Sequence, residues 1–138
     1  MPRVPADVWR LLGEVRAFQA KYPEAADAYR KSIQVSGGQA GLEQLQGLAG
    51  ALVRAGREAE AVQVVKAEVG REGRVGPVEA RLLLGKVYSQ WRGHTGDAAA
   101  VYDEIVRVAP DDFRGYLAKA VLLRDTGAKA SGLLEEDV

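Results

Sequence analysis

The chain has 138 residues, enough for one domain with a core of its own and too few for two independent domains. Lys and Arg together number 19 and Asp and Glu also number 19, so the chain has no strong overall field to attract nucleic-acid backbones. The absence of Cys excludes disulfides, thiolate metal sites and cysteine nucleophiles. No apolar run approaches the roughly 20 residues that span a bilayer, and residues 1–5 have the composition of neither a secretory nor a transit segment. These features favour a soluble intracellular protein.

The first predicted helix begins near residue 6, where Pro suits the first turn and an early carboxylate complements the positive end of the helix dipole. Apolar residues then recur at helical spacing: Val8, Leu11, Leu12, Val15 and Phe18. A break is predicted at residues 21–23. The helix that follows is expected to end near Gly37 and Gly38, because Gly adopts the left-handed conformation that closes many helices. Residues 6–39 therefore form one predicted helix-turn-helix unit.

The same pattern recurs along the chain. The second-helix alanines Ala25, Ala61 and Ala98 lie 36 and 37 residues apart, close to a repeat of about 34 residues with short insertions. Further units are predicted at about residues 42–75 and 78–111, with a partial fourth unit at about 113–136. Small side chains at shared positions allow helices to approach, and larger ones fill the space between hairpins. The predicted packing residues are Trp9, Leu12, Gly13, Ala25, Tyr29, Ala49, Ala61, Gly85, Tyr88, Ala98, Tyr102, Pro110, Tyr116 and Ala120.

These residues resemble the tetratricopeptide repeat (TPR), which has Trp, Leu, Gly and Tyr on its first helix, Ala and Phe on its second, and a terminal Pro. The resemblance covers nearly the whole chain. The first unit departs from it, with Arg16 where Tyr is usual and Gly37 where Pro is usual. The third unit matches at Leu84, Gly85, Tyr88, Ala98, Tyr102 and Pro110. The resemblance implies an all-α fold, a right-handed superhelical stack of antiparallel helix hairpins (an α-solenoid) of about three and a half repeats in a single domain.

Two places depart from a regular array. Gly47 and Gly50 lie inside the first helix of the second unit, where each costs about 0.8–1 kcal/mol relative to Ala, so this helix is predicted to open most easily. The fourth unit has a predicted turn at Gly127 and no clear second helix after it. Arrays usually close with a capping helix. Without such a helix, Val121, Leu122, Leu133 and Leu134 are expected to be poorly covered. We therefore expect either a short terminal helix that folds back or a homo-oligomer formed through the C-terminal end.

No group of residues predicts catalysis, a cofactor site or a metal site. His94, the only histidine, lies in a Gly-flanked turn, and no nucleophile or orienting partner for it can be identified. The chain has no Gly-rich phosphate loop with a Gly-Lys-Ser/Thr ending. The aromatic residues that could stack on bases coincide with the packing positions of the repeat, which favours a place in the core. The sequence therefore predicts a protein that is not an enzyme.

The TPR resemblance implies that first helices line a concave groove. The partner-binding residues that it implies are Asp7, Arg10, Glu14, Glu43, Gln46, Gly50, Glu79, Leu82, Lys86, Ser89, Leu117, Val121 and Arg124. In one well-known TPR groove, Lys, Asn and Arg side chains clamp a C-terminal carboxylate. The matching positions here are Arg10, Glu14, Gly47, Glu79 and Leu83. Since only Arg10 resembles the clamp, we expect no binding of chaperone tails in this mode.

The leading hypothesis is a non-enzymatic adaptor or assembly factor that binds a peptide or helix of another protein in its groove. One alternative is RNA binding of the pentatricopeptide type, against which stand the neutral charge and Pro110. Another is a structural role through self-association at the incomplete last repeat. The run from Asp112 to Lys119 (DFRGYLAK) is similar to a stretch in chloroplast TPR proteins of the Slow Green type, which implies a chloroplast as an alternative location.

Overall fold

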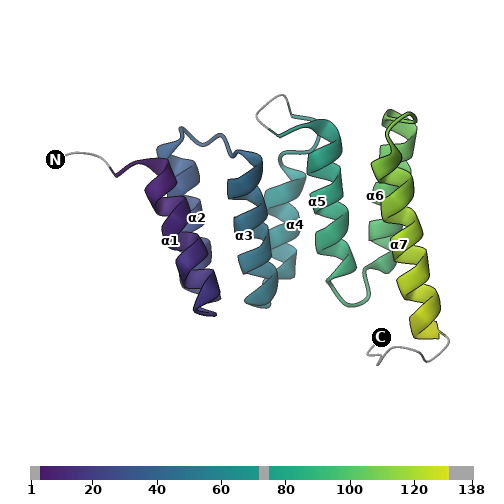
Figure 1. Ribbon diagram of the computed structural model, residues 1–138, viewed down its shortest axis with the longest axis horizontal. Helices are drawn as coiled ribbons and strands as arrows, with labels where there is room; N and C mark the ends of the chain where they lie inside the picture. The colour runs from purple at the N-terminus through teal and green to yellow at the C-terminus, as the bar shows by residue number, and fades with distance from the viewer. Residues whose placement is uncertain (1–3, 72–74, 131–138) are drawn as a thin grey trace.

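The computed structural model describes residues 4–71 and 75–130, and the regular structure in these ranges is entirely α-helical. Each helix packs against the next, and successive odd-numbered helices also contact one another, so that three hairpins and a last single helix form a row (Figure 1). The predicted all-α stack of about three and a half repeats is confirmed. The helices are α1 (Ala6–Phe18), α2 (Tyr22–Val35), α3 (Leu42–Arg54), α4 (Glu58–Lys66), α5 (Pro77–Ser89), α6 (Thr95–Val108) and α7 (Phe113–Ala130).

The turn of the first hairpin lies earlier than predicted. Ala20 has a φ of 61°, in the left-handed region, and α2 already begins at Tyr22. The predicted break at residues 21–23 is therefore wrong by about two residues, because Pro23 occupies the first turn of α2, where no backbone N–H is needed. At the other end of α2, Gly37 and Gly38 both have a φ of 84°, as expected for the close of that helix.

The core follows the small residues of the repeat. Ala25, Ala61 and Ala98 are all fully buried, each on the second helix of its hairpin. The space between hairpins is filled by larger side chains. Those that are almost completely buried are Leu45, Leu52, Val65, Val87 and Ile105. Burial of such side chains stabilises the fold by about 1.5–3 kcal/mol each relative to exposure.

The ring of Tyr29 lies between the backbones of α1 and α3. A Cβ atom at Gly13 would lie 2.9 Å from Cε1 of Tyr29, and one at Gly47 would lie 2.3 Å from the same atom. Gly47 is thus the residue that permits α3 to approach Tyr29, as well as a residue with low helix propensity. Gly50 differs, because a Cβ atom there would meet nothing within 4 Å.

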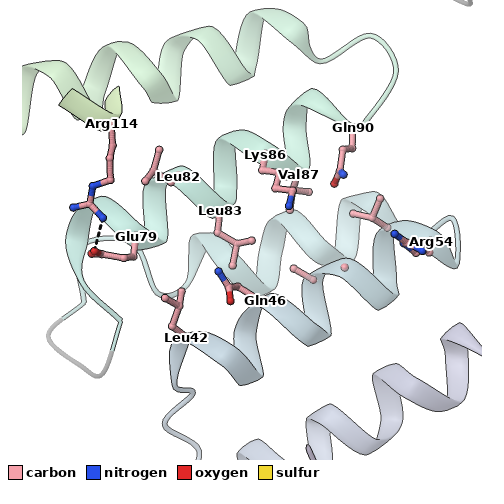
Figure 2. A pocket seen from close by; sticks show the side chains of 13 residues that line it. Leu42, Gln46, Arg54, Glu79, Leu82, Leu83, Lys86, Val87, Gln90 and Arg114 are labelled. Carbon is pink, nitrogen blue, oxygen red and sulfur yellow. Dashed lines mark hydrogen bonds and ion pairs between the residues drawn. The ribbon is translucent and has the colours of Figure 1, made fainter. Parts of the chain in front are cut away.

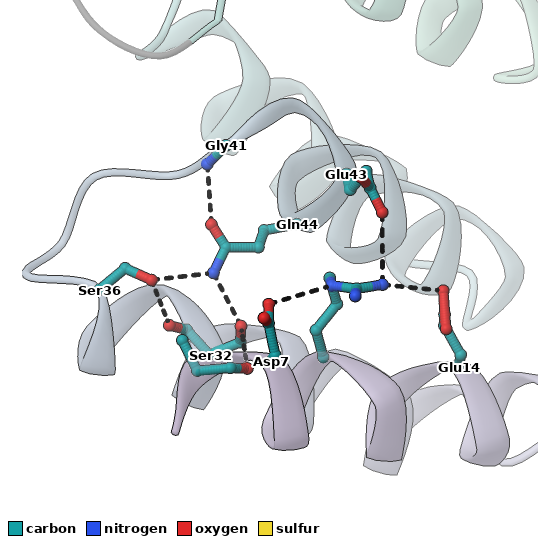
Figure 3. Close-up of polar contacts among 9 residues, drawn as sticks. Asp7, Glu14, Ser32, Ser36, Gly41, Glu43 and Gln44 are labelled. Atoms are coloured by element: carbon teal, nitrogen blue, oxygen red, sulfur yellow. Dashed lines mark hydrogen bonds and ion pairs between the residues drawn. The ribbon is translucent and has the colours of Figure 1, made fainter. Parts of the chain in front are cut away.

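A buried polar network joins the first two hairpins (Figure 3). The side-chain amide of Gln44 donates hydrogen bonds to Oγ of Ser32 (2.7 Å) and of Ser36 (3.1 Å), and its carbonyl oxygen accepts one from the N–H of Gly41 (2.8 Å). Ser32 Oγ in turn donates to the backbone oxygen of Ala6 (2.8 Å). Because a buried polar group without a partner is costly, this network fixes the start of α3 against α2 and the start of α1.

The last helix differs from the predicted partial repeat. α7 continues through Gly127 to Ala130, so the predicted turn at Gly127 is wrong. Gly127 does not have a positive φ, unlike Gly56 and Gly93 in the turns of the second and third hairpins. Tyr116 and Ala120 are exposed, because no second helix packs on them within the described part of the chain. The predicted terminal helix that folds back lies outside the described residues, as do Leu133 and Leu134.

Candidate functional site

A cleft of about 610 Å³ lies between α3, α5 and the start of α7 (Figure 2). Five of the groove residues predicted from the sequence line it: Gln46, Gly50, Glu79, Leu82 and Lys86. The remaining lining residues are Leu42, Ala49, Val53, Arg54, Leu83, Val87, Gln90 and Arg114. The first helices of the second and third hairpins, α3 and α5, therefore form two walls of this cleft.

The cleft combines an apolar floor with a polar rim. Ala49, Leu83 and Val87 are buried in the floor, whereas Arg54 and Lys86 are exposed at the rim. Arg54 donates a hydrogen bond to the hydroxyl of Tyr22 (3.3 Å), and within the described ranges neither Arg54 nor Lys86 forms an ion pair with a carboxylate. An apolar surface with two such cations at its edge suits a ligand that carries both apolar and acidic groups.

The opposite end of the cleft is closed by an ion-pair cluster on Arg114 (Figure 2). One Nη atom of Arg114 lies 2.7 Å from Glu79, and the other lies 2.7 Å from Asp112. Hydrogen bonds from the Arg114 side chain and backbone lower the pKa of Asp112 to about 2, and the bond from Arg114 lowers the pKa of Glu79. Both carboxylates are therefore ionised at neutral pH, and Arg114 is less available to a ligand than Arg54 or Lys86. Arg114 and Arg54 were not predicted from the sequence.

The N-terminal part of the predicted groove is acidic. The guanidinium of Arg10 pairs with Glu14 (3.2 Å), Glu43 (3.3 Å) and Asp7 (3.7 Å). Figure 3 labels these three carboxylates. Three carboxylates thus surround one cation, and the only residue that resembles a carboxylate clamp is engaged within the protein. Two other clamp positions hold Glu79, paired with Arg114, and buried Leu83.

The C-terminal groove residues lie around a second, smaller cleft. It measures about 360 Å³ and lies between α5, α6 and α7. Leu82, Ser89, Leu117 and Val121 line it, and Tyr102 and Leu122 also contribute. Arg124 does not line either cleft; it is exposed and pairs with the adjacent Asp125 at 3.2 Å.

His94 has a local structural environment. Its ring stacks on Trp91 with ring centroids 3.6 Å apart, and its Nδ1 atom lies 2.8 Å from a carboxylate oxygen of Asp97 in the first turn of α6. These contacts attach the turn of the third hairpin to α6. Among residues 4–71 and 75–130, no group of three or more His, Asp or Glu side chains is placed to hold a metal ion.

The row of hairpins with its clefts defines the class of this protein: it is an α-solenoid. More particularly, it has the TPR fold, as two solved structures show. The first TPR domain of Spaghetti (RPAP3), bound to the HSP90 peptide SRMEEVD, is similar with a TM-score of 0.59 and 18% identity, over 88% of this chain and 93% of that one. The Sgt2 TPR domain from Aspergillus fumigatus is similar with a TM-score of 0.62 and 16% identity, over 100% of this chain and 94% of that one.

Sequence comparisons add no closer relationship. No protein-family model matches the chain, and no curated protein matches its sequence significantly. Neither similar structure supports a chloroplast location. In the described ranges, no helix is both long enough and apolar enough to cross a membrane.

Proposed function

We propose that this protein is a non-enzymatic interaction module, an adaptor or assembly factor that binds a segment of another protein in the cleft between α3 and α5. The observation that carries the proposal is the apolar floor of this cleft beside two cations that have no carboxylate partner among the described residues. The similar Spaghetti domain holds a peptide, which supports a peptide or helix as the class of ligand.

The lining defines the chemistry of the proposed ligand. An apolar side chain of the ligand would contact Leu83 and Val87, where removal of its surface from water contributes about 25 cal/mol per Å². A carboxylate one or two residues away would meet Arg54 and Lys86 at the rim. Since Arg10 is surrounded by acidic side chains, the same ligand is not held by a clamp on its terminal carboxylate.

The proposal is tested by selecting peptides from a random display library on the wild-type protein. Selected peptides are then measured by fluorescence anisotropy against the double variant Arg54→Glu, Lys86→Glu. The matched control is Arg92→Glu, Arg107→Glu, which makes the same charge change at exposed residues outside both clefts. Circular dichroism verifies that both variants remain helical.

We expect the selected peptides to combine apolar and acidic residues. Their affinity for the cleft variant should be about tenfold lower or more, a loss of at least about 1.4 kcal/mol, and their affinity for the control should hardly change. Equal weakening in both variants would indicate non-specific charge attraction and refute the site. Failure to enrich any peptide would refute the function. Micromolar or tighter binding of an acidic chaperone C-terminal peptide would show that the protein does clamp a terminal carboxylate, contrary to our expectation.

A further inference from the structure

The outer face of α1 carries an exposed apolar stripe. The stripe consists of four apolar residues spaced three or four positions apart, so that they share one face of the helix. Three of them are about half exposed, and the last one in the chain is 94% exposed. The four residues are Val8, Leu11, Val15 and Phe18. In α5, the counterparts of Val8, Leu11 and Val15, 72 positions further along, are Ala80, Leu83 and Val87, and all three are buried. The counterpart of Phe18 is Gln90, which is exposed just after the end of α5. The α1 stripe therefore has the character of a helix-packing face.

α7 lies at the other end of the row from α1 (Figure 1), and its outer face carries a second exposed stripe. It consists of Tyr116, Ala120, Leu123 and Gly127, all exposed. The counterpart of Ala120 in α5 is Gly85, 35 positions earlier. The ring of Tyr102, on α6, packs closely against Gly85. No following helix covers the α7 stripe in the part of the chain that the structure describes.

We propose that these two stripes bind each other between copies, so that α7 of one molecule packs against α1 of the next. The sizes of the side chains favour this pairing. When the helices are set parallel, each layer joins a large residue to a smaller one, as in knobs-into-holes packing. The layers are Tyr116 with Val8, Ala120 with Leu11, Leu123 with Val15, and Gly127 with Phe18.

The charges beside the stripes favour head-to-tail pairing over pairing of identical ends. Beside the α1 stripe, Asp7 and Glu14 lie in a cluster of three carboxylates around one guanidinium. Two α1 faces packed antiparallel would bring these acidic edges together. On α7, Arg124 flanks the stripe and is largely exposed. In the parallel register it lies within one helical turn of Glu14 of the next copy, where opposite charges attract.

Such an interface is heterologous, because it joins two different surfaces. Repeated from copy to copy, it generates oligomers larger than a dimer, either closed rings or open chains. The clefts between α3, α5 and α7 lie on a different surface, and the assembly would repeat them along its length. The self-association proposed here is therefore independent of the peptide-binding proposal.

The test is analytical ultracentrifugation of the full chain over about a hundredfold range of concentration. Leu11→Glu blocks the α1 stripe and Leu123→Glu blocks the α7 stripe, and both side chains are exposed, so neither change affects the core. Val108→Glu, at an exposed apolar residue of α6 away from both stripes, is the matched control.

We expect the mass of the wild type and of Val108→Glu to rise with concentration beyond that of a dimer. Leu11→Glu and Leu123→Glu should each be monomeric alone, and an equimolar mixture of the two should double in mass, because each supplies the surface that the other retains. A monomeric wild type overturns the proposal and points to another occupant of the stripes. Self-association of either blocked variant alone overturns it in favour of pairing between identical faces. A mixture that stays monomeric overturns it too.

Discussion

The close approach of α3 to Tyr29 makes a quantitative prediction for two glycines in one helix. Ala is favoured over Gly in a helix interior by about 1 kcal/mol, so both Gly47→Ala and Gly50→Ala gain this contribution. At Gly50 the new methyl group meets nothing within 4 Å, and the variant is expected to be more stable than wild type by up to about 1 kcal/mol. At Gly47 the methyl group would lie 2.3 Å from Cε1 of Tyr29 and 2.4 Å from Cζ.

Separations this short require the ring or the helix to move, and such overpacking costs about 1–3 kcal/mol. Because the propensity gain is common to both variants, the difference between them isolates this cost: Gly47→Ala should be less stable than Gly50→Ala by about 1–3 kcal/mol. Urea unfolding followed by circular dichroism measures the difference. Adding Tyr29→Leu to Gly47→Ala should remove part of the penalty as a coupling energy. Equal stabilities for the two alanine variants would refute the close packing of Tyr29 on Gly47.

Three further predictions concern the polar network, the ion-pair cluster and nucleic acid. Gln44→Leu removes the acceptor of the Gly41 N–H and the donor to two serine oxygens, so the free energy of unfolding should fall by about 1–3 kcal/mol in urea. An unchanged value would contradict the network. Since Arg114 lowers the pKa of Asp112 from its ordinary 3.8 to about 2, the ionised carboxylate stabilises the fold above pH 4 and this contribution is lost as the pH falls towards 2. Thermal melts of Asp112→Asn should therefore depend less on pH than those of wild type between these values, and parallel curves would count against the pairing. Single-stranded RNA should bind only weakly at physiological salt, and tight binding with a steep salt dependence would favour the pentatricopeptide alternative.

The fold was predictable because its main signal is periodic and local. Ala25, Ala61 and Ala98 recur at nearly equal intervals, and each is fully buried. The meaning of an individual Gly was harder to predict. Gly47 costs helix propensity, yet it admits the ring of Tyr29, which is 18 residues earlier in the chain. At Gly127 the pattern predicts a turn, but the helix continues. In both cases the outcome depends on tertiary contacts, or on their absence, rather than on the local sequence.

For the candidate site, the sequence predicts some of the residues that line the cleft but not how their charges pair. Repeat geometry predicts that Gln46 and Lys86 face the same surface, because residues on one face of each first helix point the same way, and both residues line the cleft. It did not reveal that Arg10 would pair with Glu43, 33 residues later, or that Arg114 would bridge to Glu79, 35 residues earlier. Such pairs between hairpins depend on side-chain rotamers and on how the hairpins stack. The residues free to meet a ligand therefore became visible only in the structure.

The uneven distribution of charge along the first helices has a consequence for the direction in which a ligand lies. The acidic surroundings of Arg10 are on α1 and the start of α3, whereas Arg54 and Lys86 are near the ends of α3 and α5. An extended polypeptide with separate basic and acidic ends would find one of its two orientations electrostatically favoured. Reversing the order of residues in such a sequence, at constant composition, would then weaken its binding.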